Sequence, residues 1–263
     1  MQRERTQLLV VVAHPDDETF GTGSVIANAA ARGVRVVVCC ATRGEAGEDT
    51  SGTTNGPAEL AVVREGELRA AAEVLGAEDV VLFDFADSGL NGDMPPNALA
   101  AVDLDEVVTP IQSLIEERRP DIVVTLDPDA VNDHRDHMRI GEATTVAFSR
   151  SAKPPARLYH WTLARPLMDR WLAAMKAQGL LEEYVDLELG RPEHEITTVI
   201  DVEHVIETRR AAIAEHRTQL SPFTGLPAEM ERTLLSRDFL VRAVPRWDGG
   251  SQETDLFGDG APA

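Results

Sequence analysis

The sequence predicts an α/β protein with a Rossmann-like, doubly wound and mainly parallel sheet, helices on both faces, and a smaller irregular C-terminal portion. Strand-like and helix-like patterns alternate from the N-terminus, which is the order that parallel sheets with crossover helices produce. Two of the strand-like segments, 7–13 and 34–42, are apolar almost without interruption. Continuous apolar runs of this kind are typical of strands that are covered on both faces.

The alternating elements follow one another through the N-terminal half of the chain. The helix at 57–75 is marked most clearly, because Pro57 stands at its start and Gly76 directly after its end. Strands are expected at 7–13, 34–42, 80–85 and 121–126, and helices at 18–32, 57–75, 99–119 and 137–149. In a doubly wound sheet with strand order 3-2-1-4, the first and fourth of these strands are neighbours.

The C-terminal part is patterned less regularly. Strands are expected at 157–163 and 195–202 and helices at 166–178 and 205–219, which either extend the sheet or form a smaller cap. Residues 1–246 are interpreted as a single domain, because neither a repeat nor a linker divides them. Residues 247–263 are rich in glycine and aspartate and are expected to form a mobile tail.

Composition excludes several classes of function. The chain of 263 residues is 43% hydrophobic and 27% charged, as in soluble globular proteins, and carries a formal net charge of −20. A chain this acidic repels phosphate polyanions, so nucleic acid is not an expected partner. No run approaches the roughly 18 apolar residues of a transmembrane helix. The apolar run at 8–13 ends in acidic residues rather than a signal cleavage site, which predicts a cytoplasmic protein.

Two clusters of imidazoles and carboxylates stand after the neighbouring first and fourth strands. The first strand runs into HPDDE at 14–18, and the fourth is followed, after a short loop, by HRDH at 134–137. Carboxyl ends of adjacent parallel strands meet at one edge of the sheet, where open α/β folds bind their ligands. We therefore expect both clusters in one crevice.

The chemistry of these clusters suits a divalent cation. The first cluster alone would also fit a turn whose aspartate caps the next helix. Gly21 and Gly23 suggest a nucleotide-binding loop, but a third glycine is missing, and Asp16 and Asp17 would repel a pyrophosphate. Two histidines and one carboxylate form catalytic zinc sites and also the triad of non-haem iron oxygenases. A second carboxylate favours hydrolysis because it can deprotonate water, although the spacing does not decide which aspartate does so.

Longer motifs surround these residues. The segment AHPDDE at 13–18 is followed by TRGEAGE at 42–48, by the pattern RExEL from Arg64, and by DSG at 87–89. HRDH fits the pattern HxDH, and AAIAEHRTQ at 211–219 is close to HxSQ with threonine for serine. Together these motifs, over about residues 7–220, resemble the PIG-L/LmbE-like zinc deacetylases. TRGEAGE and DSG are most similar to the mycothiol-pathway deacetylases and amidases of that family.

The resemblance implies a role for each residue of the two clusters. One Zn²⁺ per chain would be bound by His14, Asp17 and His137. Fe²⁺ or another divalent ion is the alternative metal. Asp16 would be the general base for the attacking water. His134 would stabilise the oxyanion of the tetrahedral intermediate and protonate the leaving amine, and Asp136 would orient or charge His134.

The resemblance also implies the reaction, which is removal of an acetyl group from an amino sugar or related glycoconjugate. The loops at 45–57 and 86–97 follow the second and third strands on the same rim and are expected to recognise the sugar. The residues expected to bind the substrate are Arg64, Asp87, Glu45 and His216. Asn132 stands where mycothiol-pathway members carry a tyrosine, which sets this chain apart from them.

Two other functions stay open on the sequence. A thiol-conjugate amidase would cleave a larger amide on the same scaffold. A non-haem iron oxygenase would use the same His/Asp/His triad. In each case the partner is a small molecule, and the sequence leaves open whether the chain forms a homo-oligomer.

Overall fold

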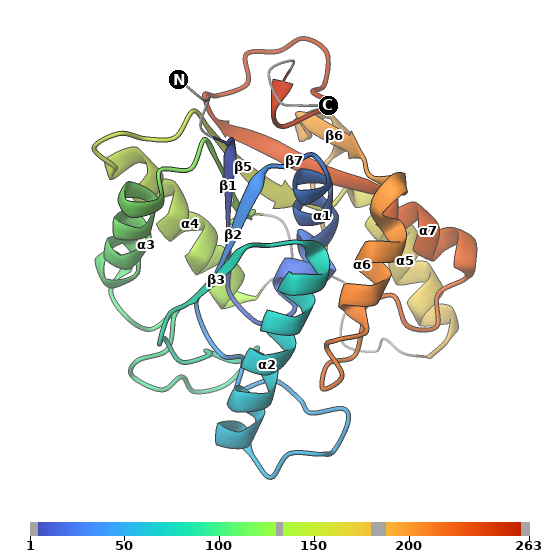
Figure 1. Cartoon of the computed structure of the whole chain (residues 1–263). Coiled ribbons are helices and arrows are strands. Elements are labelled where there is room, and N and C mark those ends of the chain that lie inside the picture. Colours follow the sequence, from blue (N-terminus) through green and yellow to red (C-terminus); the bar gives the residue numbers. More distant parts are fainter. Residues whose placement is uncertain (1–4, 130–133, 180–187, 259–263) are drawn as a thin grey trace.

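The computed structural model describes residues 5–129, 134–179 and 188–258, and over these residues it shows a seven-stranded sheet (Figure 1). The strands are β1 (Gln7–Val12), β2 (Arg35–Cys40), β3 (Asp79–Leu82), β4 (Ile122–Leu126), β5 (Arg157–Thr162), β6 (Thr198–Asp201) and β7 (Arg237–Val244). Their order is β3-β2-β1-β4-β5-β7-β6, and the pairs are parallel except for those that β7 makes with β5 and β6. The predicted α/β class and the 3-2-1-4 strand order are confirmed.

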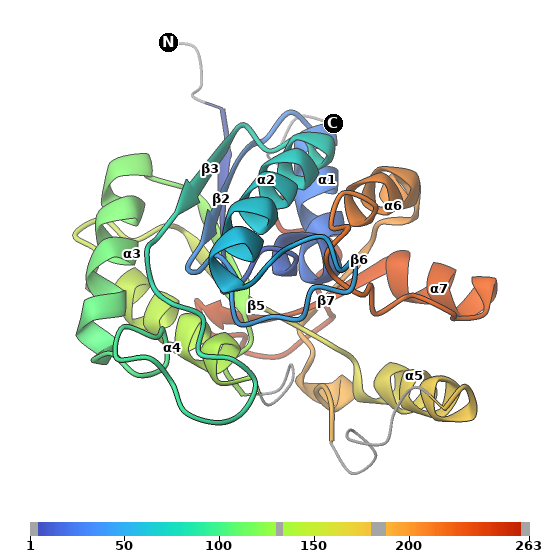
Figure 2. The ribbon, with the colours of Figure 1, turned by 90° about the horizontal axis from the view of Figure 1, so that it is seen from below.

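Helices cover both faces of this sheet, as the alternating sequence pattern predicts. The helices are α1 (Gly23–Ala31), α2 (Pro57–Leu75), α3 (Leu104–Arg118), α4 (Arg135–Arg150), α5 (Arg165–Ala177), α6 (Ile206–Ile213) and α7 (Ala228–Leu235), with short turns η1 (Asp17–Gly21), η2 (Glu193–Glu195) and η3 (Glu203–Val205). α3 and α4 pack together on one face, and α1, α2 and α6 lie on the other (Figures 1 and 2). Within the described part of the chain, no helix has the length and apolar character needed to cross a membrane.

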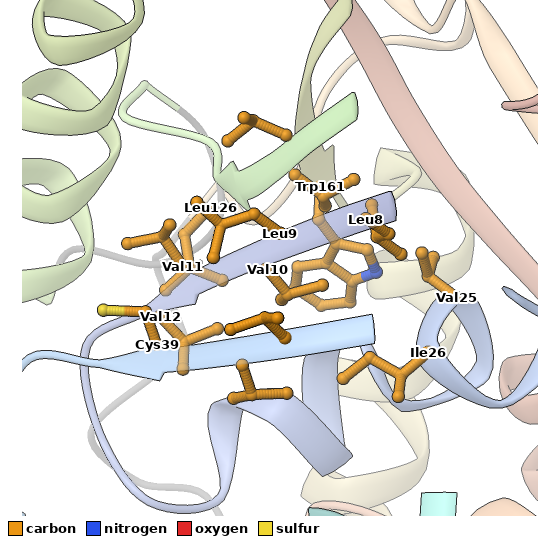
Figure 3. Packing of buried hydrophobic residues seen from close by; sticks show 14 of the residues in the cluster. Leu8, Leu9, Val10, Val11, Val12, Val25, Ile26, Cys39, Leu126 and Trp161 are labelled. Atoms are coloured by element: carbon orange, nitrogen blue, oxygen red, sulfur yellow. The ribbon is translucent and has the colours of Figure 1, made fainter. Parts of the chain in front are cut away.

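β1 lies at the centre of the main hydrophobic core. Its residues 8–12 are completely buried, because parallel neighbours flank the strand and helices cover both of its faces. Figure 3 shows these side chains packed with Cys39 of β2, Leu126 of β4, Trp161 of β5, and Val25 and Ile26 of α1. This core fixes where β1 ends and therefore where the first motif begins.

Most expected elements form close to their predicted bounds, and the differences have local causes. The helix expected at 18–32 is divided into the π-helical turn η1 and the helix α1. The helix expected from residue 99 begins at Leu104, because the Asp103 side chain caps it by accepting a hydrogen bond from the Asp105 N–H (2.9 Å). The helix expected at 205–219 ends at Ile213, and the chain continues in turns.

The C-terminal part extends the sheet. β5 and β6 match strands expected there, whereas the sequence pattern did not predict β7, which lies between them and runs antiparallel to both. Part of the segment expected to be a mobile tail packs against the sheet, at residues 252–257. Glu253 Oε2 accepts the Thr198 hydroxyl (2.9 Å), and Leu256 is 1% exposed in the main core. Residues 259–263 lie outside the described part of the chain.

Candidate functional site

The carboxyl ends of β1 and β4 carry the two predicted clusters to one place. These strands are paired directly, with Val11 opposite Thr125, so the segments that follow them leave the sheet side by side. The first segment turns through His14 into η1, and the second leads to α4, which begins directly after His134. His14, His134 and His137 offer ring nitrogens that lie within 4.8 Å of one another. The structure brings the two motifs together, as the strand order requires.

Asp17 faces two imidazoles. Its Oδ1 lies 3.1 Å from His137 Nε2, and its Oδ2 lies 3.5 Å from His14 Nδ1. Oδ2 also accepts the backbone N–H groups of Ala13 (3.2 Å) and His14 (2.8 Å), which fixes the carboxylate at the strand end. Burial opposes ionisation of Asp17, but the two histidines outweigh it and hold its pKa well below the usual value.

His14, Asp17 and His137 have the spacing of ligands around one small cation. His14 Nδ1 lies 3.3 Å from His137 Nε2, so each pair of these side chains has atoms 3.1–3.5 Å apart. Nitrogen and oxygen atoms placed tetrahedrally around zinc at its usual bond lengths lie roughly 3.3–3.4 Å from each other. The donor types and their separations therefore fit zinc or a divalent ion of similar size.

Negative charge accumulates around His14. Its Nε2 lies 3.1 Å from Asp136 Oδ2 and 3.4 Å from Asp87 Oδ1, on the opposite side of the ring from Asp17. Burial lowers the pKa of His14, but these three carboxylates outweigh it and raise the pKa well above the usual value. A bound cation would balance this excess of buried negative charge.

Asp16 has a different environment from Asp17. Its side chain is 18% exposed, and its Oδ2 accepts a hydrogen bond from Arg64 Nη2 (3.0 Å). Burial raises the pKa of Asp16 to about 6, and the charge of Arg64 acts in the opposite direction. Its backbone has φ 123°, a conformation that residues with a side chain rarely adopt and that costs about 1–3 kcal/mol. Asp16 is thus the more accessible carboxylate, whereas Asp17 is committed to the histidines.

His134 is the N-cap residue of α4. Its Nδ1 accepts the backbone N–H of Asp136 (3.2 Å), so Nε2 carries the proton of a neutral ring. The ring centroid lies 4.6 Å from that of His14 and 4.9 Å from that of His137. Burial and the charges of His14 and His137 lower the pKa of His134 to about 4, which keeps the ring neutral near pH 7.

Asp136 makes different contacts from those expected. Its buried carboxylate lies against His14 Nε2, and its Oδ1 accepts the hydroxyl of Ser88, a residue for which no role was predicted. It reaches His134 through its backbone N–H and through its charge. Helical geometry explains the difference, because residues two positions apart on a helix do not share a face. The Asp136 carboxylate is placed to orient the ring of His14, whereas the sequence predicts that it orients His134.

Arg64 reaches the first motif from α2. The side chain is 3% exposed and donates to the carbonyl oxygens of Gly44 (2.6 Å) and Pro15 as well as to Asp16. The sequence predicts that Arg64 binds the substrate. In the structure its guanidinium is instead enclosed by protein acceptors behind the Asp16 carboxylate.

The two rim loops are joined to each other through Glu45 and Asp87. The Asp87 N–H donates to Glu45 Oε1 (2.9 Å), and the Ala46 N–H donates to Asp87 Oδ2 (3.3 Å). Asp87 is 5% exposed, and burial raises its pKa less than His14 lowers it, so the carboxyl group is ionised at neutral pH. Asn132, the position that departs from the mycothiol-pathway pattern, lies outside the described residues.

His216 is buried behind the first motif. Its Nε2 lies 2.7 Å from Glu18 Oε1, and both side chains are 0% exposed. Burial lowers the pKa of His216, but the Glu18 charge outweighs it and raises the pKa above the usual value. The structure therefore joins His216 to Glu18 instead of exposing it to a substrate. Glu18 had been given no role, although it is the last residue of the AHPDDE motif.

Comparison with known proteins identifies the family. A family model described as PIG-L, GlcNAc-PI de-N-acetylase, matches residues 9–148, which is more than half of the chain. The chain belongs to the PIG-L family. A 1D-myo-inositol 2-acetamido-2-deoxy-α-D-glucopyranoside deacetylase 1 from Saccharopolyspora erythraea is 37% identical, over 96% of this chain and 93% of its own length. A deacetylase named for the same compound from Kineococcus radiotolerans is 33% identical, over 98% of this chain and 84% of its own length.

Solved structures similar to this PIG-L family member carry different activities. An N,N'-diacetylchitobiose deacetylase from Pyrococcus horikoshii has a TM-score of 0.61 and 18% identity, covering 91% of this chain and 84% of its own. GalB, the 4-carboxy-2-hydroxymuconate hydratase from Pseudomonas putida, has a TM-score of 0.61 and 19% identity, covering 93% and 99%. At these identities the likeness shows the fold alone, and the same fold serves a hydrolase and a hydratase.

Proposed function

We propose that this PIG-L family member is a zinc-dependent deacetylase that removes the acetyl group from an N-acetylglucosamine glycoside of a small polyol. The relatives described above are named as deacetylases of 1D-myo-inositol 2-acetamido-2-deoxy-α-D-glucopyranoside, so an N-acetylglucosaminyl inositol is the first substrate to test. The observation that carries the proposal is the convergence of His14, Asp17 and His137 beside the more accessible Asp16.

Three side chains would hold the zinc ion. These are His14 through Nδ1, Asp17 through a carboxylate oxygen and His137 through Nε2. When bound, zinc lowers the pKa of a water ligand to roughly 7 and polarises the substrate carbonyl. Asp136 and Asp87 accept from Nε2 of His14, which leaves the lone pair on Nδ1 for the metal.

Asp16 is the proposed base. Its carboxylate takes a proton from the attacking water while Arg64 holds one of its oxygens, and the water oxygen bonds to the acetyl carbonyl carbon. When the C–N bond breaks, the proton on Asp16 passes to the leaving nitrogen. The products are a free amine and acetic acid, which keeps the second proton of the water until it ionises to acetate in solution, and one side chain acts in turn as base and acid.

His134 is proposed to stabilise the oxyanion. Because Nδ1 accepts the Asp136 N–H, the proton of the neutral ring lies on Nε2, and this N–H would donate to the developing charge. A fixed donor of this kind contributes about 3–4 kcal/mol to transition-state stabilisation. His134 thus acts without changing its own protonation. The sequence predicts that it also protonates the leaving amine, but that step is assigned to Asp16, because a pKa of about 4 leaves the His134 ring neutral near pH 7.

Sugar recognition is proposed for the joined rim loops at 45–57 and 86–97. Glu45 and Asp87 are their polar anchors, and both lie on the side of the sheet edge where β2 and β3 end. A site that hydrogen-bonds substrate hydroxyls discriminates against compounds that lack them, because its buried polar groups are then unpaired. Arg64 is not proposed to contact the sugar, because protein acceptors surround its guanidinium. It acts through Asp16, whose carboxylate it holds.

Release of free amine from N-acetylglucosaminyl inositol by the zinc-loaded protein tests the proposal, with free N-acetylglucosamine as the comparison. Asp16→Asn should keep stoichiometric zinc and lose most of its turnover, because an amide cannot take the proton. His14→Ala should lose zinc, since one of three ligands is gone.

Three results would overturn parts of this proposal. A zinc-loaded protein that releases amine from none of the N-acetylglucosamine glycosides is not the proposed deacetylase. Amine release from a thiol conjugate, with none from the N-acetyl substrates, would identify an amidase instead. Wild-type turnover in Asp16→Asn would remove the base role.

A further inference from the structure

Glu18 has a buried carboxylate that holds the backbone of the proposed base. Its Oε2 accepts the Asp16 N–H (2.9 Å), and its Oε1 accepts the Thr19 hydroxyl and lies 2.7 Å from His216 Nε2. The side chain is 0% exposed, so it touches neither solvent nor a substrate. Its contribution to the site therefore passes through the groups that it binds.

Asp16 needs such support because of its backbone conformation. At φ 123° it lies in a region that residues with a side chain rarely adopt, and such residues persist where the surroundings fix them from several directions. The Asp16 carbonyl oxygen accepts the N–H groups of Thr19 (2.9 Å) and Phe20 (2.7 Å), and Arg64 holds its carboxylate. Glu18 holds the remaining backbone group, the N–H.

His216 in turn fixes the position of the Glu18 carboxylate. It follows α6, and 198 residues separate it from Glu18 along the chain. Its ring is buried, with the Phe20 ring 5.6 Å away in an edge-to-face arrangement. α6 lies beside α1 and α2 in both views (Figures 1 and 2), so the C-terminal part of the chain reaches the first motif directly.

The segment that carries His216 is anchored independently of Glu18. The Thr218 N–H and hydroxyl donate to the Glu67 carboxylate of α2 at 3.0 and 2.6 Å. The Thr50 N–H of a rim loop donates to the Thr218 carbonyl oxygen (2.9 Å). These bonds hold the imidazole in place, so that it can act as a fixed support for Glu18.

We propose, resting on the base role proposed for Asp16, that His216 is a positioning residue for catalysis. His216 donates from Nε2 to Glu18, and Glu18 holds the Asp16 N–H, so that the Asp16 carboxylate stays where it can take a proton from the attacking water. This gives the histidine of the C-terminal segment a function that requires no contact with the substrate. The signature of such a role is a lower kcat with unchanged zinc binding and KM.

Two substitutions at His216 separate positioning from packing. His216→Leu fills similar space without a donor, whereas the side-chain amide of His216→Gln can still donate to Glu18. In zinc-loaded protein, His216→Leu should lower kcat by about 10-fold to 100-fold, which is the loss expected when a catalytic group is misplaced. KM and zinc content should stay within about twofold of the wild-type values. His216→Gln should recover most of that loss. Equal losses in both variants would overturn the proposal in favour of packing.

A double-variant cycle tests whether His216 acts through Asp16. In the Asp16→Asn background, His216→Leu should cause no further loss of the residual kcat, because the group that it positions no longer takes the proton. A further loss as large as in the wild-type background would overturn the proposal. Wild-type turnover in Asp16→Asn would instead refute the base role, so the two failures are distinguishable.

A matched control and a second variant complete the test. His160→Leu removes another buried histidine, whose Nε2 lies 2.9 Å from the Thr145 hydroxyl, and should leave kcat unchanged.

If His216→Leu does not fold, as judged by circular dichroism, Glu18→Gln gives the answer. The amide of this variant offers one acceptor oxygen where the Glu18 carboxylate offers two, so kcat should again fall by about 10-fold to 100-fold. An unchanged kcat in Glu18→Gln, or in a folded His216→Leu, would overturn the proposal.

Discussion

The turn after β1 and the start of α4 bring their side chains together at one edge of the sheet, but different interactions fix the two segments. η1 is held from a distance, because the buried Arg209 of α6 donates to the carbonyl oxygens of Thr19 (3.1 Å) and Gly21 (3.0 Å), and also to that of Phe20. The backbone at the start of α4 is held locally by the His134 cap, and the Asp136 side chain accepts the hydroxyl of Ser88, 48 residues earlier.

The difference follows from the backbone of each segment. A regular helix such as α4 pairs most of its own carbonyl groups, whereas the irregular η1 turn leaves buried carbonyls that need donors from elsewhere. The backbone of the first motif therefore depends on donors about 190 residues away in the sequence, whereas the backbone of the second motif is paired within α4 and only its side chains reach distant partners. Substitutions in each support should show this contrast.

The largest effect is expected for Arg209→Met. The change removes the Arg209 donor from three carbonyl groups, of which those of Thr19 and Gly21 are buried. It also leaves Asp238, whose Oδ1 lies 3.7 Å from the guanidinium, without its counter-charge. Breaking a buried pair in this way costs about 3–5 kcal/mol of the free energy of unfolding, measurable by urea denaturation. Arg210→Met on the same helix is the control. It removes half-exposed pairs with Glu207 and Glu231 and should cost less than about 1 kcal/mol. Equal losses of unfolding free energy in Arg209→Met and Arg210→Met would show that η1 does not depend on Arg209.

The next effect is expected for Arg64→Met. Loss of the guanidinium frees the Asp16 carboxylate and the Pro15 carbonyl, so kcat for amine release should fall about 100-fold while zinc stays bound. Arg69→Met on the same helix removes an exposed pair with Glu65 and should leave kcat unchanged. Loss of zinc from Arg64→Met would show that the guanidinium supports the ligands rather than the base.

A smaller effect is expected for Asp136→Asn, a change in the second motif that acts on His14 of the first. The amide offers His14 Nε2 a weaker acceptor, and changes of this kind behind a metal ligand lower metal affinity about 10-fold to 100-fold. Competition with a chromophoric chelator measures the change. Asp84→Asn, on an 88%-exposed carboxylate after β3, should leave the affinity as it is. Wild-type zinc affinity in Asp136→Asn would show that its carboxylate does not orient His14.

The smallest effect is expected for Arg191→Met and depends on pH. Arg191 pairs with Asp127, the residue that directly follows β4. Burial raises the pKa of Asp127, but Arg191 outweighs it and holds the pKa below the usual value. Since the folded-state pKa is the lower one, this pair stabilises the protein above about pH 4 and the stabilisation is lost as the pH falls further. Arg191→Met should lower the unfolding free energy by about 1–2 kcal/mol at pH 7, and the difference from wild type should narrow below pH 4. A difference that is constant down to pH 3 would refute this linkage.

Elements with a strong local pattern could be predicted from the sequence. The apolar runs of β1, β2 and β4 and the alternation of strands and helices give the fold, and the strand order then places His14 beside His137. β7 could not be recognised in this way. It owes its place to pairing with β5 and β6, which are distant in sequence, and five of its eight residues are half-buried, so its apolar run is interrupted.

The partners of the site residues were harder to predict than the residues themselves. The sequence does not show that Arg64 donates to Gly44 or that Asp87 is bonded to Glu45, because these partners come from loops whose paths depend on tertiary structure. Asp136 is adjacent in sequence to the motif histidines, yet its carboxylate bonds to Ser88, 48 residues earlier. Proximity along the chain predicts which groups gather at a site, whereas side-chain direction decides which of them meet.

The packed segment after residue 247 has a consequence for the outer edge of the sheet. β6 is the last strand, and its outer side is met by Glu253, whose carbonyl oxygen accepts the Val199 N–H (2.8 Å) and whose N–H donates to the Thr197 carbonyl oxygen (2.8 Å). An uncovered edge strand is a template for pairing with another chain and so for aggregation. By occupying these backbone groups, the segment makes this edge a poor starting point for intermolecular β-sheet growth.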